Sequence, residues 1–197
     1  MKKVLLYSGG MDSYIINYLW KPDVLLYIDY GIPQNAEEIK RLPKETIIKE
    51  VDLSEYMEGD GKNTIPLRNL LFASIGINYG DVVAIGGVKD DLHYDKTRRF
   101  AWKTTRLFNS VLKREDSKRK VKIVVPYRKY TKEQLLRLYV ESGGSLSRLM
   151  SDTWSCYAPK KNGKPCGKCN PCNRRREAIE GVQNNDYEYP RYHHYYY

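Results

Sequence analysis

Short apolar runs alternate with helical patterns along most of the chain. The apolar runs predict strands at 3–7, 24–28, 46–51, 81–85 and 121–125. The run Val24–Ile28 is apolar throughout, as expected of a parallel strand that is covered on both faces. Helices are predicted at 12–20, 70–77, 97–113 and 131–139. A short polar helix is predicted at 35–42, ended by Pro43. This alternation is typical of βαβ units around a parallel sheet and predicts an α/β fold.

The sequence also predicts which surfaces of two of these helices are buried. Helix 70–77 has almost no charge, so we expect it to be buried. Helix 97–113 is amphipathic, and its predicted apolar face consists of Phe100, Thr104, Leu107, Phe108 and Val111. The segment 54–64 is rich in glycine and acidic residues and is expected to be a mobile loop.

The first strand leads directly into Ser-Gly-Gly-Met-Asp-Ser at 8–13. A strand, a glycine turn and a helix start form a cradle for phosphate, because backbone N–H groups converge there and the positive end of the helix favours an anion. The glycines permit close approach, the serines can donate hydrogen bonds, and Asp12 can cap the helix or hold Mg²⁺. An ordinary capped turn is the alternative, and the chain has neither G-x-x-x-x-G-K-[ST] nor G-x-G-x-x-G after a strand.

All four cysteines lie in one short window, as Cys156, Cys166, Cys169 and Cys172. Four thiolates at this density in a reduced compartment predict a tetrahedral Zn²⁺ site, and four protein ligands would make the metal structural. Disulfides are one alternative. An iron–sulfur cluster is another, because the C-x2-C-x2-C spacing also suits it.

Composition and charge narrow the class of protein. With 197 residues, 29% charged and 41% hydrophobic, the chain has the composition of a soluble globular domain. No apolar stretch approaches the ~20 residues that span a bilayer, and the first apolar run is too short for a signal peptide, so we expect a cytoplasmic protein. The net charge is +10, and residues 96–132 hold fourteen Lys or Arg against two acids. A nucleic-acid face is possible but not favoured over a solvated surface with groups for an anionic substrate.

These features divide the chain into three parts. We predict an ATP-binding α/β domain at 1–150, a zinc-binding element at 151–182 and a tyrosine-rich tail at 183–197. The tail has six tyrosines and no periodicity, so we expect it to be weakly ordered or to lie over a neighbouring molecule.

The chain has both the 8–13 loop and the cluster of four cysteines, and in this it resembles the QueC family, the 7-cyano-7-deazaguanine synthases of queuosine biosynthesis. The hexapeptide at 8–13 is similar to the pyrophosphate loop of the wider PP-loop ATP pyrophosphatase superfamily. Further matches follow in order: Asp-Tyr-Gly at 29–31, Pro-x-Arg-Asn-x-Leu-Phe at 66–72, Thr-Trp-Ser-Cys-Tyr at 153–157 and Cys-Gly-Lys-Cys-Asn-Pro-Cys at 166–172. The resemblance implies a parallel, Rossmann-like sheet of the adenine nucleotide alpha hydrolase type, a C-terminal zinc-binding element and a homodimer.

The resemblance also implies a reaction, in which ATP activates a deazaguanine carboxylate and ammonia converts it to a nitrile. Nucleotide contacts are then expected from Tyr7, Ser8, Gly9, Gly10, Met11, Asp12, Ser13, Asp29, Arg68 and Asn69. Catalytic roles are expected for Ser8, Asp12, Ser13, Lys89 and Arg98, with Mg²⁺ near Asp12. Arg99 is an alternative to Lys89 and Arg98, Asp90 is an alternative to Asp29 for reading a guanine-like edge, and Arg68 and Asn69 could be purely structural.

The chain departs from the family pattern in its substrate-facing loops. Ile32-Pro33-Gln34 stands where the family usually has Gln-Arg-His, Leu67 stands where glycine is common, and the loop after the fourth strand is reduced to 92–95. ATP use is therefore a firmer expectation than the substrate. The alternatives are a PP-loop enzyme that modifies tRNA or amidates another carboxylate, and a non-catalytic zinc-binding protein. A compact, divergent form of this kind would suit a phage-encoded member.

Overall fold

A five-stranded parallel sheet with strand order β3-β2-β1-β4-β5 forms the centre of the molecule. The computed structural model describes residues 1–32, 35–58 and 64–184. The strands are β1 (Lys3–Leu6), β2 (Val24–Asp29), β3 (Ile47–Glu50), β4 (Val82–Ile85) and β5 (Lys122–Val124). Strands β2 and β3 are added on one side of β1, and β4 and β5 are added on the other side, so the order of the strands changes direction between β1 and β4. Ligands of such sheets bind at the carboxyl ends of the strands near this point. The predicted parallel α/β fold is confirmed.

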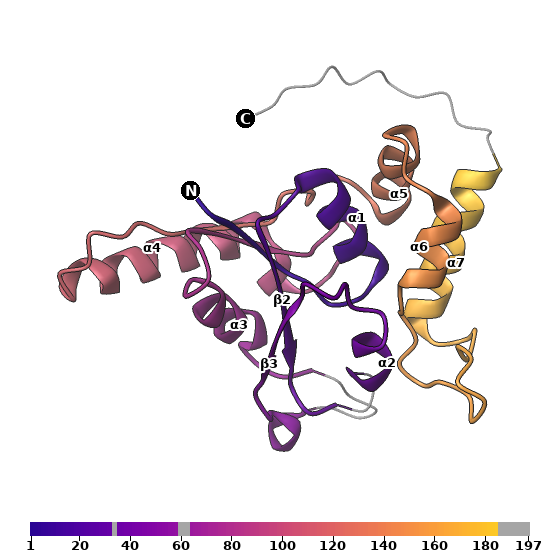
Figure 1. The fold of residues 1–197 in the computed structure, drawn as a ribbon, viewed down its shortest axis with the longest axis horizontal. Helices are drawn as coiled ribbons and strands as arrows, with labels where there is room; N and C mark the ends of the chain where they lie inside the picture. The colour runs from indigo at the N-terminus through magenta and orange to yellow at the C-terminus, as the bar shows by residue number, and fades with distance from the viewer. Residues whose placement is uncertain (33–34, 59–63, 185–197) are drawn as a thin grey trace.

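Helices cover both faces of the sheet (Figure 1). They are α1 (Met11–Trp20), α2 (Asn35–Ile39), α3 (Arg68–Gly76), α4 (Arg98–Arg114), α5 (Lys132–Glu141), α6 (Leu146–Asp152) and α7 (Asn170–Gln183), with short 3-10 turns η1 (Ser54–Tyr56) and η2 (Tyr94–Lys96). Helices α3 and α4 pack on one face, and α1 and α5 pack on the other, where α6 and α7 add an outer layer. The sequence analysis did not predict α6 and α7.

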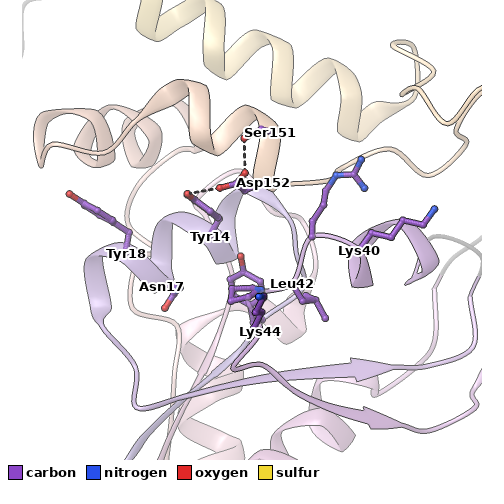
Figure 2. Close-up of a pocket in the computed structure, with 11 residues that line it drawn as sticks. Tyr14, Asn17, Tyr18, Lys40, Leu42, Lys44, Ser151 and Asp152 are labelled. Atoms are coloured by element: carbon purple, nitrogen blue, oxygen red, sulfur yellow. Dashed lines mark hydrogen bonds between the residues drawn. The ribbon is translucent and has the colours of Figure 1, made fainter.

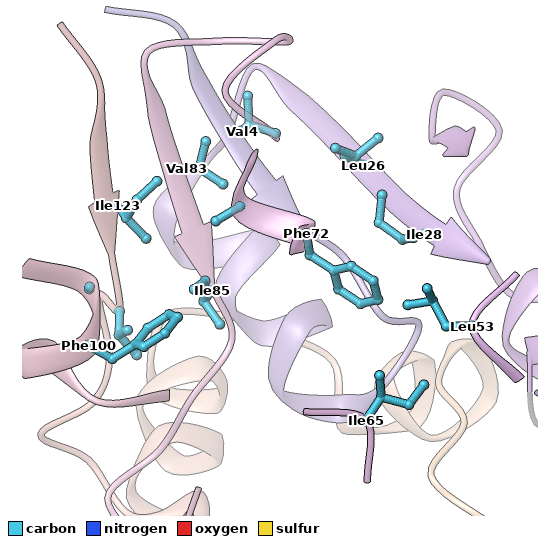
Figure 3. Close-up of a cluster of buried hydrophobic side chains, with 13 residues drawn as sticks. Val4, Leu26, Ile28, Leu53, Ile65, Phe72, Val83, Ile85, Phe100 and Ile123 are labelled. Carbon is cyan, nitrogen blue, oxygen red and sulfur yellow. The ribbon is translucent and has the colours of Figure 1, made fainter. Parts of the chain in front are cut away.

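Side chains that alternate along β1 belong to two separate cores. Val4 packs with Phe72 of α3 and Phe100 of α4 (Figure 3), whereas Leu5 packs with Ile15 of α1 and with the α5 side chains. Both β1 side chains are fully buried. This explains why the strands are apolar at successive positions, since neighbouring side chains of a strand point to opposite faces.

The apolar face predicted for helix 97–113 is only partly buried. Phe100 and Thr104 are buried and Phe108 packs against the core, but Leu107 and Val111 are 52% and 45% exposed. Helix α4 has 17 residues, whereas the adjoining strand β5 has three. The last turns of α4 therefore extend past the sheet (Figure 1).

Other predicted boundaries also moved. Helix α2 ends at Ile39 instead of residue 42, and α3 leaves Leu71 37% exposed despite its low charge. The predicted loop 54–64 contains η1 and an antiparallel bridge between Glu58 and Thr64, and its residues 59–63 lie outside the described part of the chain. The predicted tail lies outside it too, apart from residues 183–184. In the described ranges, no helix has the length and apolar character needed to cross a membrane.

Candidate functional site

The 8–13 loop lies at the carboxyl end of β1, where the chain turns into α1. Gly9 has a φ of +68°, and Gly10 is the N-cap residue of α1 without a side-chain capping bond. The Ser13 hydroxyl donates to the Gly10 carbonyl (3.0 Å) and accepts from the Ser8 amide N–H (3.2 Å), which closes the loop. The amides in the first turn of a helix have no acceptor within the helix, so this corner offers N–H donors to an anion.

Gly9 allows two other segments to lie against the loop. A Cβ atom on Gly9 would lie 3.3 Å from both the Cβ atom and the carbonyl oxygen of Glu38 in α2. The Gly9 carbonyl accepts a hydrogen bond of 2.9 Å from the Trp154 amide N–H. The loop is therefore held between α2 and the segment that precedes the cysteines.

Asp12 forms an ion pair with Lys132 at the start of α5. The Lys132 amide N–H donates to Asp90 (3.0 Å), so the loop after β4 lies at the same edge of the sheet. Sequence reasoning missed Lys132, because only the fold brings together residues that are 120 positions apart. The pair adds a cation beside the predicted phosphate cradle.

Lys89 and Arg98 also follow β4, and both are exposed. The Lys89 amide N–H donates to the Tyr130 carbonyl (2.7 Å). Within the described residues, neither side chain forms a hydrogen bond or ion pair with the 8–13 loop.

Asp91, two residues after Lys89, is a buried acid that the sequence analysis did not identify. It accepts hydrogen bonds from the Val88 amide (3.1 Å), Lys96 (3.4 Å) and Arg174 (3.1 Å). Burial opposes ionisation of the Asp91 carboxyl, but Lys96, the Val88 amide and Arg174 together lower its pKa. Asp91 therefore attaches α7, which carries Arg174, to the loop after β4.

The residues predicted after β2 and at the start of α3 lie near one another. Asp29 accepts hydrogen bonds from the Asn35 side chain and from the Gly31 amide (3.1 Å). Arg68 donates to the Tyr30 hydroxyl (3.1 Å), and its guanidinium lies 5.2 Å from the centre of that ring. Asn69 is 7% exposed, and its Nδ2 has no hydrogen-bond partner among the described residues. A buried amide without a protein partner is a group that a bound ligand could satisfy.

Glu38 is a half-buried acid in the same region, which the sequence analysis overlooked. It accepts a hydrogen bond of 2.8 Å from the Tyr27 hydroxyl. Burial raises the pKa of Glu38 to about 7, against the lowering effects of the Tyr27 hydrogen bond and of Arg68. The Asp-Tyr-Gly motif at 29–31 predicted a site at this end of β2. No sequence pattern distinguished Glu38 from the other acid in the following helix.

Leu67, which stands where the resembled family commonly has glycine, has a left-handed backbone with φ +58° and is 69% exposed. A left-handed conformation costs a residue with a Cβ about 1–2 kcal/mol. We expect Leu67→Gly to raise the free energy of unfolding by about 0.5–1 kcal/mol, because glycine's larger loss of chain entropy offsets only part of that strain. Thermal denaturation measures this. Leu71→Gly, in the interior of α3, is the control and should destabilise the protein by about 1 kcal/mol; equal losses in both variants would contradict the prediction.

The four cysteines converge into one cluster, in which all the Sγ atoms lie within 4.8 Å of one another. No disulfide joins these four cysteines. The amides of Lys168 and Cys169 donate to the Cys166 Sγ at 3.5 and 3.3 Å, and these bonds lower the pKa of the Cys166 thiol to about 6. Four converging sulfur donors with backbone N–H support fit a metal ion.

Trp154 connects this cluster to the α/β domain. Its amide N–H binds the Gly9 carbonyl, and its indole N–H donates to the Cys156 carbonyl (2.8 Å). The Arg41 guanidinium lies 4.5 Å from the centre of the indole ring. The Arg174–Asp91 ion pair is a further attachment, which joins the helix after the cysteines to the loop after β4.

A cavity of about 590 Å³ lies beside α1, between that helix, the chain after α2 and the end of α6 (Figure 2). Tyr14 and Tyr18 of α1 line it opposite the chain that follows α2. Tyr7 lines this cavity, and its buried hydroxyl has no hydrogen-bond partner among the described residues. Residues 8–13 do not line it, so this cavity is separate from the predicted phosphate cradle.

Comparison with known proteins identifies the family of this chain. Residues 34–183 match the family described as "Queuosine biosynthesis protein QueC". The 7-cyano-7-deazaguanine synthase of Persephonella marina is 26% identical, with 93% of this chain and 94% of that protein covered. The 7-cyano-7-deazaguanine synthase of a Sulfurihydrogenibium species is 27% identical, with 89% and 93% covered. Among solved structures, the U34-tRNA thiolase NcsA from Methanococcus maripaludis with its [4Fe-4S] cluster has a TM-score of 0.46 at 18% identity, with 94% of this chain and 66% of that chain covered. Because the family match covers most of the sequence, the chain belongs to the QueC family.

Proposed function

We propose that the protein uses ATP and ammonia to convert 7-carboxy-7-deazaguanine to 7-cyano-7-deazaguanine. The observation that carries this proposal is the glycine corner between β1 and α1, in a chain that matches 7-cyano-7-deazaguanine synthases over nearly its whole length. This corner has the form expected of a site for a triphosphate.

The chemistry explains why a nucleotide is needed. A carboxylate is a poor electrophile until one of its oxygens becomes part of a leaving group. Its oxygen attacks the α-phosphorus of ATP, which releases pyrophosphate and leaves an acyl adenylate. Ammonia then displaces AMP to give the amide and a proton. The amide oxygen attacks a second ATP in the same way and releases pyrophosphate, and loss of AMP and of both remaining N–H protons leaves the nitrile.

The residues predicted to be catalytic each have a role in this scheme. The Ser8 hydroxyl and the Ser13 amide would stabilise the departing pyrophosphate, while Lys89 and Arg98 steady the α-phosphate or the substrate carboxylate. Asp12, a half-buried carboxylate, would hold Mg²⁺, which neutralises phosphate charge when it is bound. Lys132, the present partner of Asp12, would then be free to contact a phosphate oxygen.

The substrate would lie over the carboxyl end of β2. Asp29 would accept hydrogen bonds from the N–H edge of the deazaguanine, and the unpaired Asn69 amide would donate one to the carbonyl group of the deazaguanine. The four cysteines would hold a structural Zn²⁺, because four sulfur ligands leave no open position for chemistry.

The proposal predicts that pyrophosphate release depends on the substrate. Purified protein with Mg-ATP should release pyrophosphate when 7-carboxy-7-deazaguanine is added, and mass spectrometry should detect the nitrile once ammonium is present. Asp12→Ala should lower both signals by about 100-fold. Pyrophosphate release at the same rate without any carboxylate would contradict the proposal.

A second candidate function is modification of tRNA by a related PP-loop enzyme. The observation that favours it is the basic segment 96–132, which includes the projecting helix α4. Binding of unmodified tRNA that weakens steeply with salt would support this candidate, and a lack of tRNA binding at low salt would exclude it.

A further inference from the structure

We propose that Glu38 is the general base that accepts the proton released when ammonia attacks the activated carboxyl group. This inference rests on the function proposed above. It adds a catalytic residue to the predicted set and assigns it to the ammonia-dependent step instead of the adenylation step.

The position of Glu38 is the first argument. Its Cβ and carbonyl oxygen lie 3.3 Å from where a Cβ atom of Gly9 would be, so its backbone contacts the proposed pyrophosphate loop. Its side chain reaches the phenol of Tyr27, a residue of β2, at 2.8 Å. The carboxyl group therefore lies between the loop that would bind ATP and the strand end that would bind the deazaguanine.

The surroundings of Glu38 are the second argument. Its charged and titratable neighbours come from β2, the turn after it, the start of α3 and the cysteine region, and they are Tyr27, Asp29, Tyr30, Arg68 and Tyr157. Arg68 is the one cation among these five groups. Partial burial raises the pKa of Glu38 to about 7, with Asp29 adding to the increase, while Tyr27 and Arg68 oppose it. A base with a pKa near the working pH accepts and returns protons most efficiently.

The proton transfer balances in both halves of the reaction. The ammonia nitrogen bonds to the acyl carbon, the bond from that carbon to the AMP oxygen breaks, and one N–H proton passes to the Glu38 carboxylate. The second adenylation leaves an O-adenylated amide with two N–H protons. One of them is lost to water, and the other passes to the same carboxylate as the carbon–nitrogen triple bond forms and AMP leaves. Between these steps Glu38 returns its proton to water.

The test separates adenylation from amination. Glu38→Gln should keep substrate-dependent ATP–pyrophosphate exchange within about 3-fold of the native protein, since no base is needed for that half-reaction. Formation of amide and nitrile from ammonium should fall about 100-fold or more. The acidic limb of the kcat profile, with a midpoint near pH 7 in the native protein, should disappear. Glu37→Gln is the matched control: Glu37 is the adjacent acid of α2, it pairs with Lys40 and Arg41, and its loss should leave both rates unchanged.

A second variant keeps the proposal testable if Glu38→Gln folds poorly. Tyr27→Phe removes the hydrogen bond that lowers the pKa of Glu38, so the acidic limb should move to higher pH while the plateau rate is kept. An equal fall in exchange and product formation in Glu38→Gln would overturn the proposal, as would an unchanged acidic limb in Tyr27→Phe. Failure of the native protein to catalyse the exchange would instead overturn the proposed function, and this inference with it.

Discussion

Replacing Gly9 with valine is expected to abolish ATP binding and to lower turnover by about 100-fold or more. A branched side chain fits poorly at a φ of +68°, and its Cβ would lie 3.3 Å from the backbone carbonyl oxygen of Glu38, which has little room to move. The loop would have to shift, and its carbonyl would lose the bond from Trp154. Donors that must meet a triphosphate within a few tenths of an ångström would then be misplaced.

Calorimetric titration with Mg-ATP measures this effect directly. Gly143→Val is the matched control, because Gly143 also has a positive φ (+88°) but a Cβ there would meet only the Tyr18 hydroxyl, at 3.6 Å. The control should lose a similar amount of stability and keep its ATP affinity. An undiminished heat of binding in Gly9→Val would exclude the 8–13 loop as the nucleotide site.

Replacing Cys169 with alanine is expected to remove the metal and to lower the melting temperature by about 10 °C or more. A structural zinc site contributes roughly 10 kcal/mol of binding free energy to folding, and each kcal/mol corresponds to about 2–4 °C in a chain of this size. ATP affinity should fall as well, because Trp154 connects the cysteine region to the Gly9 carbonyl.

Elemental analysis and thermal denaturation test this prediction. Lys168→Ala changes a neighbouring exposed residue that contributes only its backbone amide to the cluster, so it should retain one metal ion per chain. Zinc gives a colourless protein, whereas an iron–sulfur cluster absorbs visible light. An unchanged melting temperature after loss of the metal would contradict a structural role.

The parts that could be predicted from the sequence are those that depend on neighbouring residues. The strands follow from short apolar runs, and the corner at 8–13 follows from a local order of strand, glycines and helix start. The convergence of the cysteines follows from their close spacing. Patterns of this kind predict structure well because each depends only on residues that are close together in the sequence.

The contacts that hold the candidate site together could not be predicted in this way. Lys132 reaches Asp12, and Arg174 reaches Asp91, only because the fold brings the starts of α5 and α7 to the loops at the carboxyl ends of β1 and β4. Helix α7 has a local signal, a proline in its first turn, but its residues lie in the segment that was predicted only as a zinc-binding element. Leu107 is exposed because α4 is much longer than β5. The spacing of apolar residues predicts which face of a helix is apolar, but not how long the neighbouring strand is.

The bond between Trp154 and Gly9 has a consequence for biosynthesis. Gly9 and Trp154 are 145 positions apart, so during translation the donor that completes the turn is made long after the turn itself. A translation product that stops before Trp154 would therefore lack the contact that closes this corner. The same contact joins the corner to the segment that leads into Cys156, so disorder of the cysteine cluster would also remove this donor from the loop.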